Sequence, residues 1–277
     1  AGETVELAVA ALRELNDAGL SASLNLLGES VRHAEEARQA RDTYLGALDR
    51  IRAAGADANV SVKLTQMGLD IDEALCVANL RAIIARAKAH GSFARIDMEQ
   101  STYTEKTLHL FTETFYPEFG GAVGVVLQSY LRRTARDVEA MIALGARVRL
   151  CKGAYKEPET VAFPAKRDVD ANYVACMERL LEHGRYPGIA THDAKIIAHA
   201  KAFTKERGIP PARYEFQMLY GVRRDLQHAL RREGYNVRVY VPFGTHWYPY
   251  LMRRLAERPA NIAFIVGNVV KEFLRWT

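Results

Sequence analysis

The sequence predicts an α/β protein with a distorted (βα)8 barrel of the TIM type. Short runs rich in β-branched and other apolar residues alternate with longer amphipathic stretches, and no linker or low-complexity segment interrupts the 277 residues. Eight βα units in about 250 residues match such a barrel. A doubly wound sheet is the alternative, but no G-x-G-x-x-G follows the first predicted strand.

The predicted strands are apolar runs that end in a polar residue, a glycine or a proline. In order, they read SLNLLG, NVSVKLT, FARIDME, GVVLQS, RVRLCK, GIATH, YEFQMLY and RVYVP, and cover residues 23–28, 59–65, 93–99, 124–129, 147–152, 188–192, 214–220 and 238–242. The predicted helices have apolar residues at helical spacing and cover residues 35–52, 71–90, 103–115, 135–144, 170–183, 196–207 and 224–233. One barrel domain over residues 1–277 is expected.

Composition is that of a soluble globular protein. Hydrophobic residues make up 49% and charged residues 26%, and no run of about 18 apolar residues could span a bilayer. The start, AGETVELAVAALREL, has no basic segment and does not resemble a secretory signal. We expect a cytoplasmic protein, with peripheral contact at the cytoplasmic face of the inner membrane as an option.

The cysteines and the charge exclude several classes of site. Cys76, Cys151 and Cys176 form no C-x-x-C pair, which argues against a disulfide framework and a thiolate zinc site. His192 has no second ligand at metal-binding spacing, so no metal is predicted. The net charge of +5 is modest and its basic residues are interspersed with acids, so nucleic-acid binding is weakly supported.

Polar side chains gather where the predicted strands end. Barrel enzymes place their chemistry at the carboxyl ends of the strands, and a charge inside a barrel is costly unless it is paired. An active site at this rim is therefore expected. The residues are Lys63, Asp97, Glu99, Gln128, Arg149, Lys152, Thr191, His192, Asp193, Gln217 and Tyr240.

Two of these positions allow more than one interpretation. Arg149 and Lys152, in RLCKGAY, are three residues apart and hence on opposite faces of an extended segment, so one can point inward while the other lies at the rim. Gly153 would allow the backbone to approach a bound group closely. Lys63 could be a Schiff-base lysine or a fixed cation that pairs with Asp97.

A polar stripe near the carboxyl terminus points to carboxylate binding. Tyr250, Arg253, Arg254 and Glu257 recur at i, i+3, i+4 and i+7, so a helix places them on one face. Two adjacent guanidinium groups suit a small carboxylate, and the acid one turn later can hold one of them in place. A solvated helical face is the alternative, and the spacing alone leaves both open.

Seven motifs together resemble bacterial proline dehydrogenase of the monofunctional, FAD-dependent kind. They read SVKLTQMGLD, ARIDMEQS, VLQSYLRRT, RLCKGAYKEP, ATHD, FQMLYGVR and YVPFGTHWYPYLMRRLAERPAN, in collinear order from about residue 20 to residue 262. The resemblance implies a distorted barrel that binds FAD without a Rossmann fold. It also implies oxidation of L-proline to Δ1-pyrroline-5-carboxylate, the first step of proline catabolism to glutamate, with transfer of electrons to a membrane quinone. Relatives carry additional N-terminal helices, which this sequence is expected to lack.

The resemblance also assigns residues. For the substrate it implies that Arg253, Arg254 and Lys63 contact the proline carboxylate, that Glu257 pairs with an arginine, and that Leu219, Tyr240 and Tyr250 pack against the ring. The implied FAD-lining residues are Asp97, Met98, Gln128, Arg149, Lys152, Gly153, Ala154, Thr191, His192, Gln217 and Met218. The catalytic set is then Lys63, Asp97, Arg149 and Tyr240, with Arg149 stabilising a reduced, anionic flavin.

Two other functions remain open on the residues alone. A Schiff-base aldolase or lyase on the same barrel would use Lys63 or Lys152 as nucleophile and need no flavin. A carboxylate-binding module would use only Arg253 and Arg254 and show no turnover.

Overall fold

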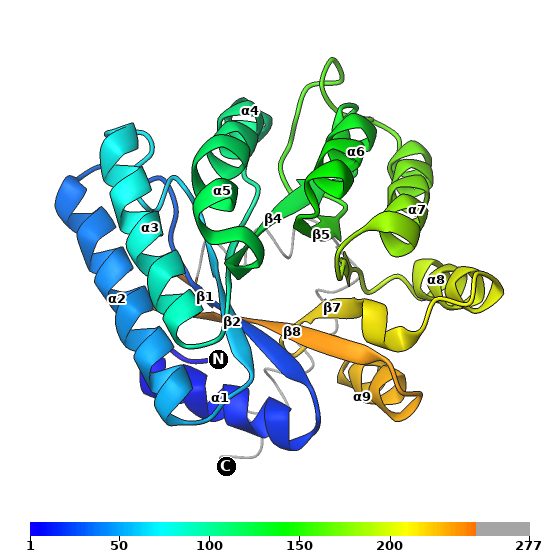
Figure 1. Ribbon diagram of the computed structural model, residues 1–277, viewed down its shortest axis with the longest axis horizontal. Helices are drawn as coiled ribbons and strands as arrows, with labels where there is room; N and C mark the ends of the chain where they lie inside the picture. The colour runs from blue at the N-terminus through cyan, green and yellow to red at the C-terminus, as the bar shows by residue number, and fades with distance from the viewer. Residues whose placement is uncertain (248–277) are drawn as a thin grey trace, which may run out of the picture.

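A computed structural model describes residues 1–247, which form a closed barrel of eight parallel strands in sequence order (Figure 1). Parallel neighbours need a crossover between them, and the helices supply it on the outside of the barrel. The strands are β1 (Ser21–Leu26), β2 (Ala58–Val62), β3 (Ala94–Ile96), β4 (Val123–Gln128), β5 (Arg147–Cys151), β6 (Gly188–Ala190), β7 (Glu215–Leu219) and β8 (Asn236–Phe243).

The outer layer consists of helices that connect successive strands, together with one helix that precedes β1. They are α1 (Val5–Asp17), α2 (Ala34–Ala53), α3 (Glu73–Ala89), α4 (Ser101–His109), the π-helix η1 (Leu110–Phe115), α5 (Tyr116–Phe119), α6 (Thr134–Leu144), α7 (Lys166–His183), α8 (Ala194–Glu206) and α9 (Arg224–Arg232). Short 3-10 turns, η2 (Gly120–Ala122) and η3 (Pro211–Arg213), precede β4 and β7. Helix α1 packs against β1, β8 and α2.

The predicted barrel and all eight predicted strands are confirmed, with differences at the ends. Strand β3 ends at Ile96, three residues before the predicted end, although the Asp97 amide just beyond it still donates to the Val62 carbonyl at 2.9 Å. The predicted helix 103–115 is part α-helix and part π-helix. Pro117 follows it and has no amide proton, so the α-helical hydrogen-bond ladder is interrupted there.

The strands separate two different interiors. Successive side chains point to opposite faces of a strand, so one set faces the helices and the other faces the barrel axis. The set that faces the helices is apolar and forms the main core, as Val60, Val148 and Phe216 illustrate. The set that faces the axis includes polar and charged groups, among them Ser23, Asn25, Asn59, Ser61, Arg95, Asp97, Arg149, Glu215, Gln217 and Arg238, all buried.

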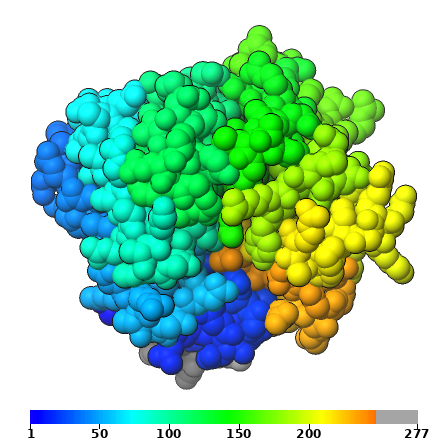
Figure 2. Space-filling view, viewed as in Figure 1, coloured from blue at the N-terminus to red at the C-terminus, as the bar shows by residue number. Residues whose placement is uncertain are grey.

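The barrel is closed more extensively at one seam than at another. Strands β1 and β8 pair over six positions, from Ser21 opposite Arg238 to Leu26 opposite Phe243, whereas β5 and β6 pair over two. Figure 2 shows the outer segments packed into a continuous surface, with atoms of the α9–β8 region visible near the centre of this face. Within residues 1–247, no helix combines the length and hydropathy needed to cross a membrane.

Candidate active site

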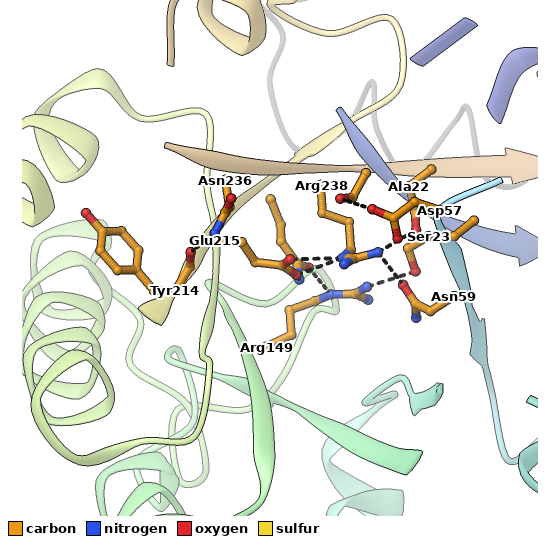
Figure 3. A network of polar contacts seen from close by, with 12 residues as sticks. Ala22, Ser23, Asp57, Asn59, Arg149, Tyr214, Glu215, Asn236 and Arg238 are labelled. Carbon is orange, nitrogen blue, oxygen red and sulfur yellow. Dashed lines mark hydrogen bonds and ion pairs between the residues drawn. The ribbon is translucent and has the colours of Figure 1, made fainter. Parts of the chain in front are cut away.

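Arg149 lies at the centre of the carboxyl-terminal half of the barrel. Its side chain is only 6% exposed, and every nitrogen of its guanidinium group has a partner. Nη1 donates to Asp97 Oδ1 at 2.8 Å and Nε to Gln217 Oε1 at 2.5 Å. Nη2 donates to the hydroxyls of Ser61 at 3.1 Å and Ser23 at 3.3 Å. Residues of four other strands, or from just beyond their ends, therefore fix one cation near the barrel axis, as Figure 3 shows in part.

Tyr240 completes this arrangement from β8. Its hydroxyl donates to Asp97 Oδ2 at 2.8 Å, so each oxygen of that carboxylate has a partner from a different strand. The Tyr240 ring also lies 5.0 Å from the Arg149 guanidinium carbon, within the range of a cation–π contact. Three of the four residues predicted as catalytic are thus in direct contact.

Lys152 follows β5 and lies at the rim, while Arg149 points inward. This answers the question that the RLCKGAY motif leaves open. Lys152 Nζ contacts Asp193 Oδ2 at 3.1 Å and Asp170 Oδ1 at 2.5 Å. Burial is the largest single influence on Asp193 and works against its charged form, but the hydrogen bond and charge of Lys152 together with the backbone amides at the start of α8 outweigh it, and the pKa of Asp193 is lowered. A loop and two helix starts are tied together by this cation.

The Thr191–His192–Asp193 segment connects β6 to α8. Asp193 is the N-cap of α8 and accepts from the Lys195 amide at 3.1 Å, while Thr191 Oγ1 accepts from the Asp193 amide. His192 Nε2 accepts from the Leu219 amide at 2.9 Å. An accepting Nε2 carries no proton, so this ring is neutral and holds its proton on Nδ1.

Gly153 and Ala154 begin the loop between β5 and α7. Gly153 has φ +110°, and a Cβ placed on it would overlap the ring of Tyr130. The glycine is therefore required by the chain's own packing as well as by any bound group. Farther along the loop, the Glu157 carboxylate accepts from the Ser101 amide at 2.7 Å and ties the loop to the start of α4.

Gln128 ends β4 with one half of its amide unpaired. Its Nε2 donates to the Met98 carbonyl at 3.4 Å, but Oε1 is buried and has no partner among the described residues. A buried acceptor without a donor calls for an explanation, and a ligand N–H is one. Met98 and Met218, both predicted to line a flavin, belong to the main apolar core.

Lys63 and Glu99 occupy the rim beside this site. A pairing of Lys63 with Asp97 is one of the two options that the sequence leaves open for this lysine, and in the structure Asp97 has Arg149 as an ion-pair partner. Glu99 is 1% exposed and accepts from the Thr65 hydroxyl at 2.5 Å and the Thr65 amide at 3.1 Å. Burial raises the pKa of Glu99 to about 7, although the hydrogen bonds from Thr65 and the charge of Lys63 oppose the rise.

Four predicted residues lie outside the part of the chain that the structure describes. They are Tyr250, Arg253, Arg254 and Glu257, and the carboxylate clamp remains a prediction from the sequence. Leu219 ends β7 beside His192, and Gln217 connects Arg149 to Glu215, to which Gln217 Nε2 donates at 2.5 Å.

The proline dehydrogenase family model matches residues 8–266 of this chain. The chain belongs to the proline dehydrogenase family. "Proline dehydrogenase 1" of Bacillus subtilis is 43% identical over 272 residues, which cover 98% of this chain and 89% of that protein. "Proline dehydrogenase" of Deinococcus radiodurans is 44% identical over 275 residues, covering 98% and 88%. The protein is therefore an oxidoreductase that acts as a proline dehydrogenase.

Solved structures of the family share the fold. Proline utilization A from Bdellovibrio bacteriovorus, inactivated by N-propargylglycine, superposes with a TM-score of 0.84 at 28% identity and covers 92% of this chain and 31% of that one. Family membership removes the aldolase alternative. For Lys152, one of the two lysines in that alternative, the contacts agree, because two carboxylates engage its amine and a Schiff-base lysine needs a free one.

Sequence reasoning missed several residues of this candidate site. Ser23 and Ser61 are partners of Arg149, and Asp170 is a partner of Lys152. The serines carried a signal, since both are small polar residues in apolar runs, at positions that alternate toward the axis. Asp170 lies in the first turns of α7, and only the tertiary fold brings it to β5.

Proposed function

We propose that this enzyme oxidises L-proline to Δ1-pyrroline-5-carboxylate with FAD bound at the carboxyl-terminal rim of the barrel, and that a membrane quinone accepts the electrons. The observation that carries the proposal is the fixed Arg149 cation, held by Asp97, Gln217 and two serines beside the Tyr240 ring. A preorganised cation in a water-poor site favours the negative charge that develops during substrate oxidation.

The described rim fits a flavin on three observations. The buried Gln128 Oε1 has no donor among residues 1–247, the His192 ring has its proton on Nδ1, and Lys152 places a positive charge at the rim beside Asp193. Ring systems with amide-like edges and phosphates present complementary donors and anions. Gln128, Arg149, Lys152, His192 and Gln217 would hold the group. When bound, FAD would accept the hydride equivalent from proline.

The chain's own residues would do the rest by positioning. Tyr240 would pack against the proline ring, with its hydroxyl held by Asp97. Lys63 would contact the carboxylate together with Arg253 and Arg254, which lie outside the described residues. The ring carbon beside the amine would then face the acceptor in one orientation. Proton loss from the amine must precede oxidation, so activity is expected to rise with pH until the bound amine is neutral.

A visible spectrum of freshly purified protein tests the cofactor. We expect a yellow protein whose flavin survives gel filtration, because its predicted ligands come from several strands. Gln128→Leu should weaken FAD binding, since it removes the orphaned acceptor, whereas exposed Arg167→Met should not. Folded protein that stays colourless with excess FAD would contradict the cofactor assignment.

The substrate is tested with a proline analogue and with the predicted clamp. The Bdellovibrio relative is inactivated by N-propargylglycine. We expect the same compound to cause time-dependent loss of activity here, with protection by L-proline. Arg253→Met or Arg254→Met should raise KM for proline by about 30-fold or more, since each removes a charge-assisted contact to the carboxylate. An unchanged KM in both variants would favour the alternative interpretation, in which Arg253 and Arg254 lie on a solvated helical face and do not bind the substrate.

The electron acceptor is tested by activity with a water-soluble quinone and without any acceptor. Proline oxidation should continue only with the quinone, and flavin reduced by proline under argon should be reoxidised when the quinone is added. Equal turnover with dissolved oxygen alone would contradict the quinone assignment.

A further inference from the structure

The amino-terminal mouth of the barrel, opposite the catalytic rim, holds a cavity of about 420 Å3. It is lined by the starts of strands and the turns before them: Asp57, Ala58, Asn59, Gly91, Ser92, Phe93, Gly121, Ala122, Arg147 and Arg238. This volume falls within the range of small-molecule sites. None of the residues predicted for proline or flavin binding contributes to its lining.

Three guanidinium groups surround one aromatic ring at this mouth. The guanidinium carbons of Arg147, Arg95 and Arg238 lie 4.9, 5.2 and 5.6 Å from the centroid of the Phe93 ring. We call Arg95, Arg147 and Arg238 the arginine cluster. They come from β5, β3 and β8, so three strands converge on one point.

Two members of the cluster are incompletely satisfied. Arg95 is 1% exposed, yet its Nε and Nη1 have no hydrogen-bond partner among the described residues, and neither does the buried Nε of Arg147. Arg238, by contrast, donates to both oxygens of Glu215 at 2.9 and 3.0 Å and to Asn59 Oδ1 at 3.3 Å, as Figure 3 shows in part. Burial lowers the pKa of both Arg95 and Arg147.

The surrounding charges do not supply the missing partner. Glu215 is the buried acid of this half, and Asp57 lines the cavity at its mouth, where it accepts from Ser21 Oγ. Arg185 adds a further cation, since its Nη2 lies 2.9 Å from where a Cβ on Gly121 would be. Four guanidinium groups thus face two carboxylates, an excess of two positive charges in and around the cavity.

The strands could form the barrel without an arginine cluster at this mouth. The amino-terminal face of such barrels usually serves stability, but buried, unpaired guanidinium N–H groups cost free energy. The glycine at position 188 leaves room for two inward side chains: a Cβ placed on Gly188 would overlap Gln217 Nε2 and would lie 3.3 Å from Arg95 Nη1. The strands therefore accommodate a cation that packing alone would not need.

We propose that the arginine cluster and its cavity form a binding site for a small oxyanion, a phosphate or carboxylate group, distinct from the catalytic rim. Such an anion accepts from Arg147 and Arg238 at the cavity wall and offsets the charge of Arg95 behind the Phe93 ring. Planar guanidinium forks match phosphate and carboxylate oxygens.

The test measures thermal unfolding of the purified protein, saturated with FAD and proline so that the catalytic rim is filled. Sodium phosphate and sodium acetate are titrated separately at constant ionic strength set with sodium chloride. A saturable rise in Tm with phosphate alone assigns the site to phosphate groups, and a rise with acetate also assigns it to carboxylates. The same Tm in phosphate, acetate and chloride would overturn the proposal.

Arg147→Met and the exposed Arg167→Met form a matched pair of variants. Arg147→Met should weaken phosphate binding by about tenfold or more, as loss of one charge-assisted contact predicts, while kcat and KM for proline stay unchanged. Arg167, whose side chain is 92% exposed, should leave binding unchanged when replaced. Equal phosphate affinity in wild type and Arg147→Met would place the anion elsewhere. The wild-type titration decides the matter by itself if Arg147→Met does not fold.

Discussion

The two halves of the barrel interior use the same side chain in opposite ways. In the carboxyl-terminal half, Arg149 is buried and all its nitrogens are partnered, with Asp97 as a nearby counter-charge. In the amino-terminal half, Arg95 is more deeply buried and has two nitrogens without a described partner. Arg149, with every nitrogen partnered, is held rigidly, whereas the unpartnered nitrogens of Arg95 and Arg147 leave positive charge that the proposed anion would offset. Hydrogen-bond completeness, more than burial, separates the two roles.

The largest expected change in stability comes from removing Arg149, whose guanidinium nitrogens are all partnered in the carboxyl-terminal half of the barrel. Arg149→Met leaves the Asp97 carboxylate buried without its counter-charge, so the free energy of unfolding should fall by about 3–5 kcal/mol. Proline turnover should be lost at the same time. Urea denaturation of wild type and variant measures the first effect, and Arg179→Met, which breaks an exposed pair with Glu139, is the control at under about 1 kcal/mol. A loss of stability as small as that of Arg179→Met would show that Asp97 does not depend on Arg149 as its counter-charge.

Glu99 gives a pH-dependent effect of intermediate size beside the saturated half. Its pKa rises from 4.5 to about 7 on folding, so the folded state binds the proton more tightly than the unfolded state. Stability from this group is fully present below about pH 4.5 and is lost as the pH rises toward and through 7. The difference is on the order of 3 kcal/mol.

Urea denaturation of wild type and Glu99→Gln between pH 5 and 8 measures this contribution. The difference between the two unfolding free energies should change with pH across that interval, in the direction that favours wild type at the acid end. Parallel curves would show that Glu99 has an ordinary pKa in the folded protein.

Much of the barrel follows from the sequence because each strand is an apolar run that the chain repeats at helix-length intervals. The polar residues at strand ends, such as Asp97 and Arg149, were also identified, since barrel topology brings strand ends together. The ion pair between Asp97 and Arg149 could not be predicted, because the sequence alone makes Lys63 and Arg149 equally suitable cations for Asp97. Only the inward direction of Arg149 decides between them.

The arginine cluster shows that the spacing of residues in the sequence can predict side-chain direction but not side-chain pairing. Arg95, Arg147 and Arg238 lie inside predicted strands, at positions that alternate with apolar residues, so an inward direction could have been inferred. Distances across the barrel decide which of these arginines forms hydrogen bonds with Glu215. Those distances are set by strand register and by the space beside Gly188, which a linear pattern does not encode.

A substitution in the amino-terminal half should change the free energy of unfolding in the opposite direction, as an increase. Arg95→Met removes a cation that has two nitrogens without a partner in residues 1–247, and it keeps a side chain of similar length against Phe93, so the protein should gain about 1–2 kcal/mol in chloride buffer. The gain should shrink in phosphate, where the wild-type charge is offset. Urea denaturation in both buffers provides the comparison with Arg149→Met. A loss of several kcal/mol in chloride would show that both halves are equally saturated.

The smallest effect is expected at the rim. Lys152 is 22% exposed, so Lys152→Met should lower the free energy of unfolding by only about 1 kcal/mol, because solvent screens the two acids it leaves behind. FAD affinity should fall much more than stability does. Comparing the two losses by fluorescence titration and urea denaturation separates a binding cation from a structural one, and equal losses would contradict the binding role.

The short pairing between β5 and β6 sets where the barrel opens most readily. Two residue pairs join these strands, Arg149 with Gly188 and Leu150 with Ile189, whereas six join β1 and β8. Fewer ladder hydrogen bonds mean a lower free energy of local opening, so backbone amides of β6 exchange with solvent long before those of β1. Arg149 and His192 flank this seam. We expect local opening at this seam to widen the rim on one side while the β1–β8 wall keeps its register, so that a large ligand could enter without global unfolding.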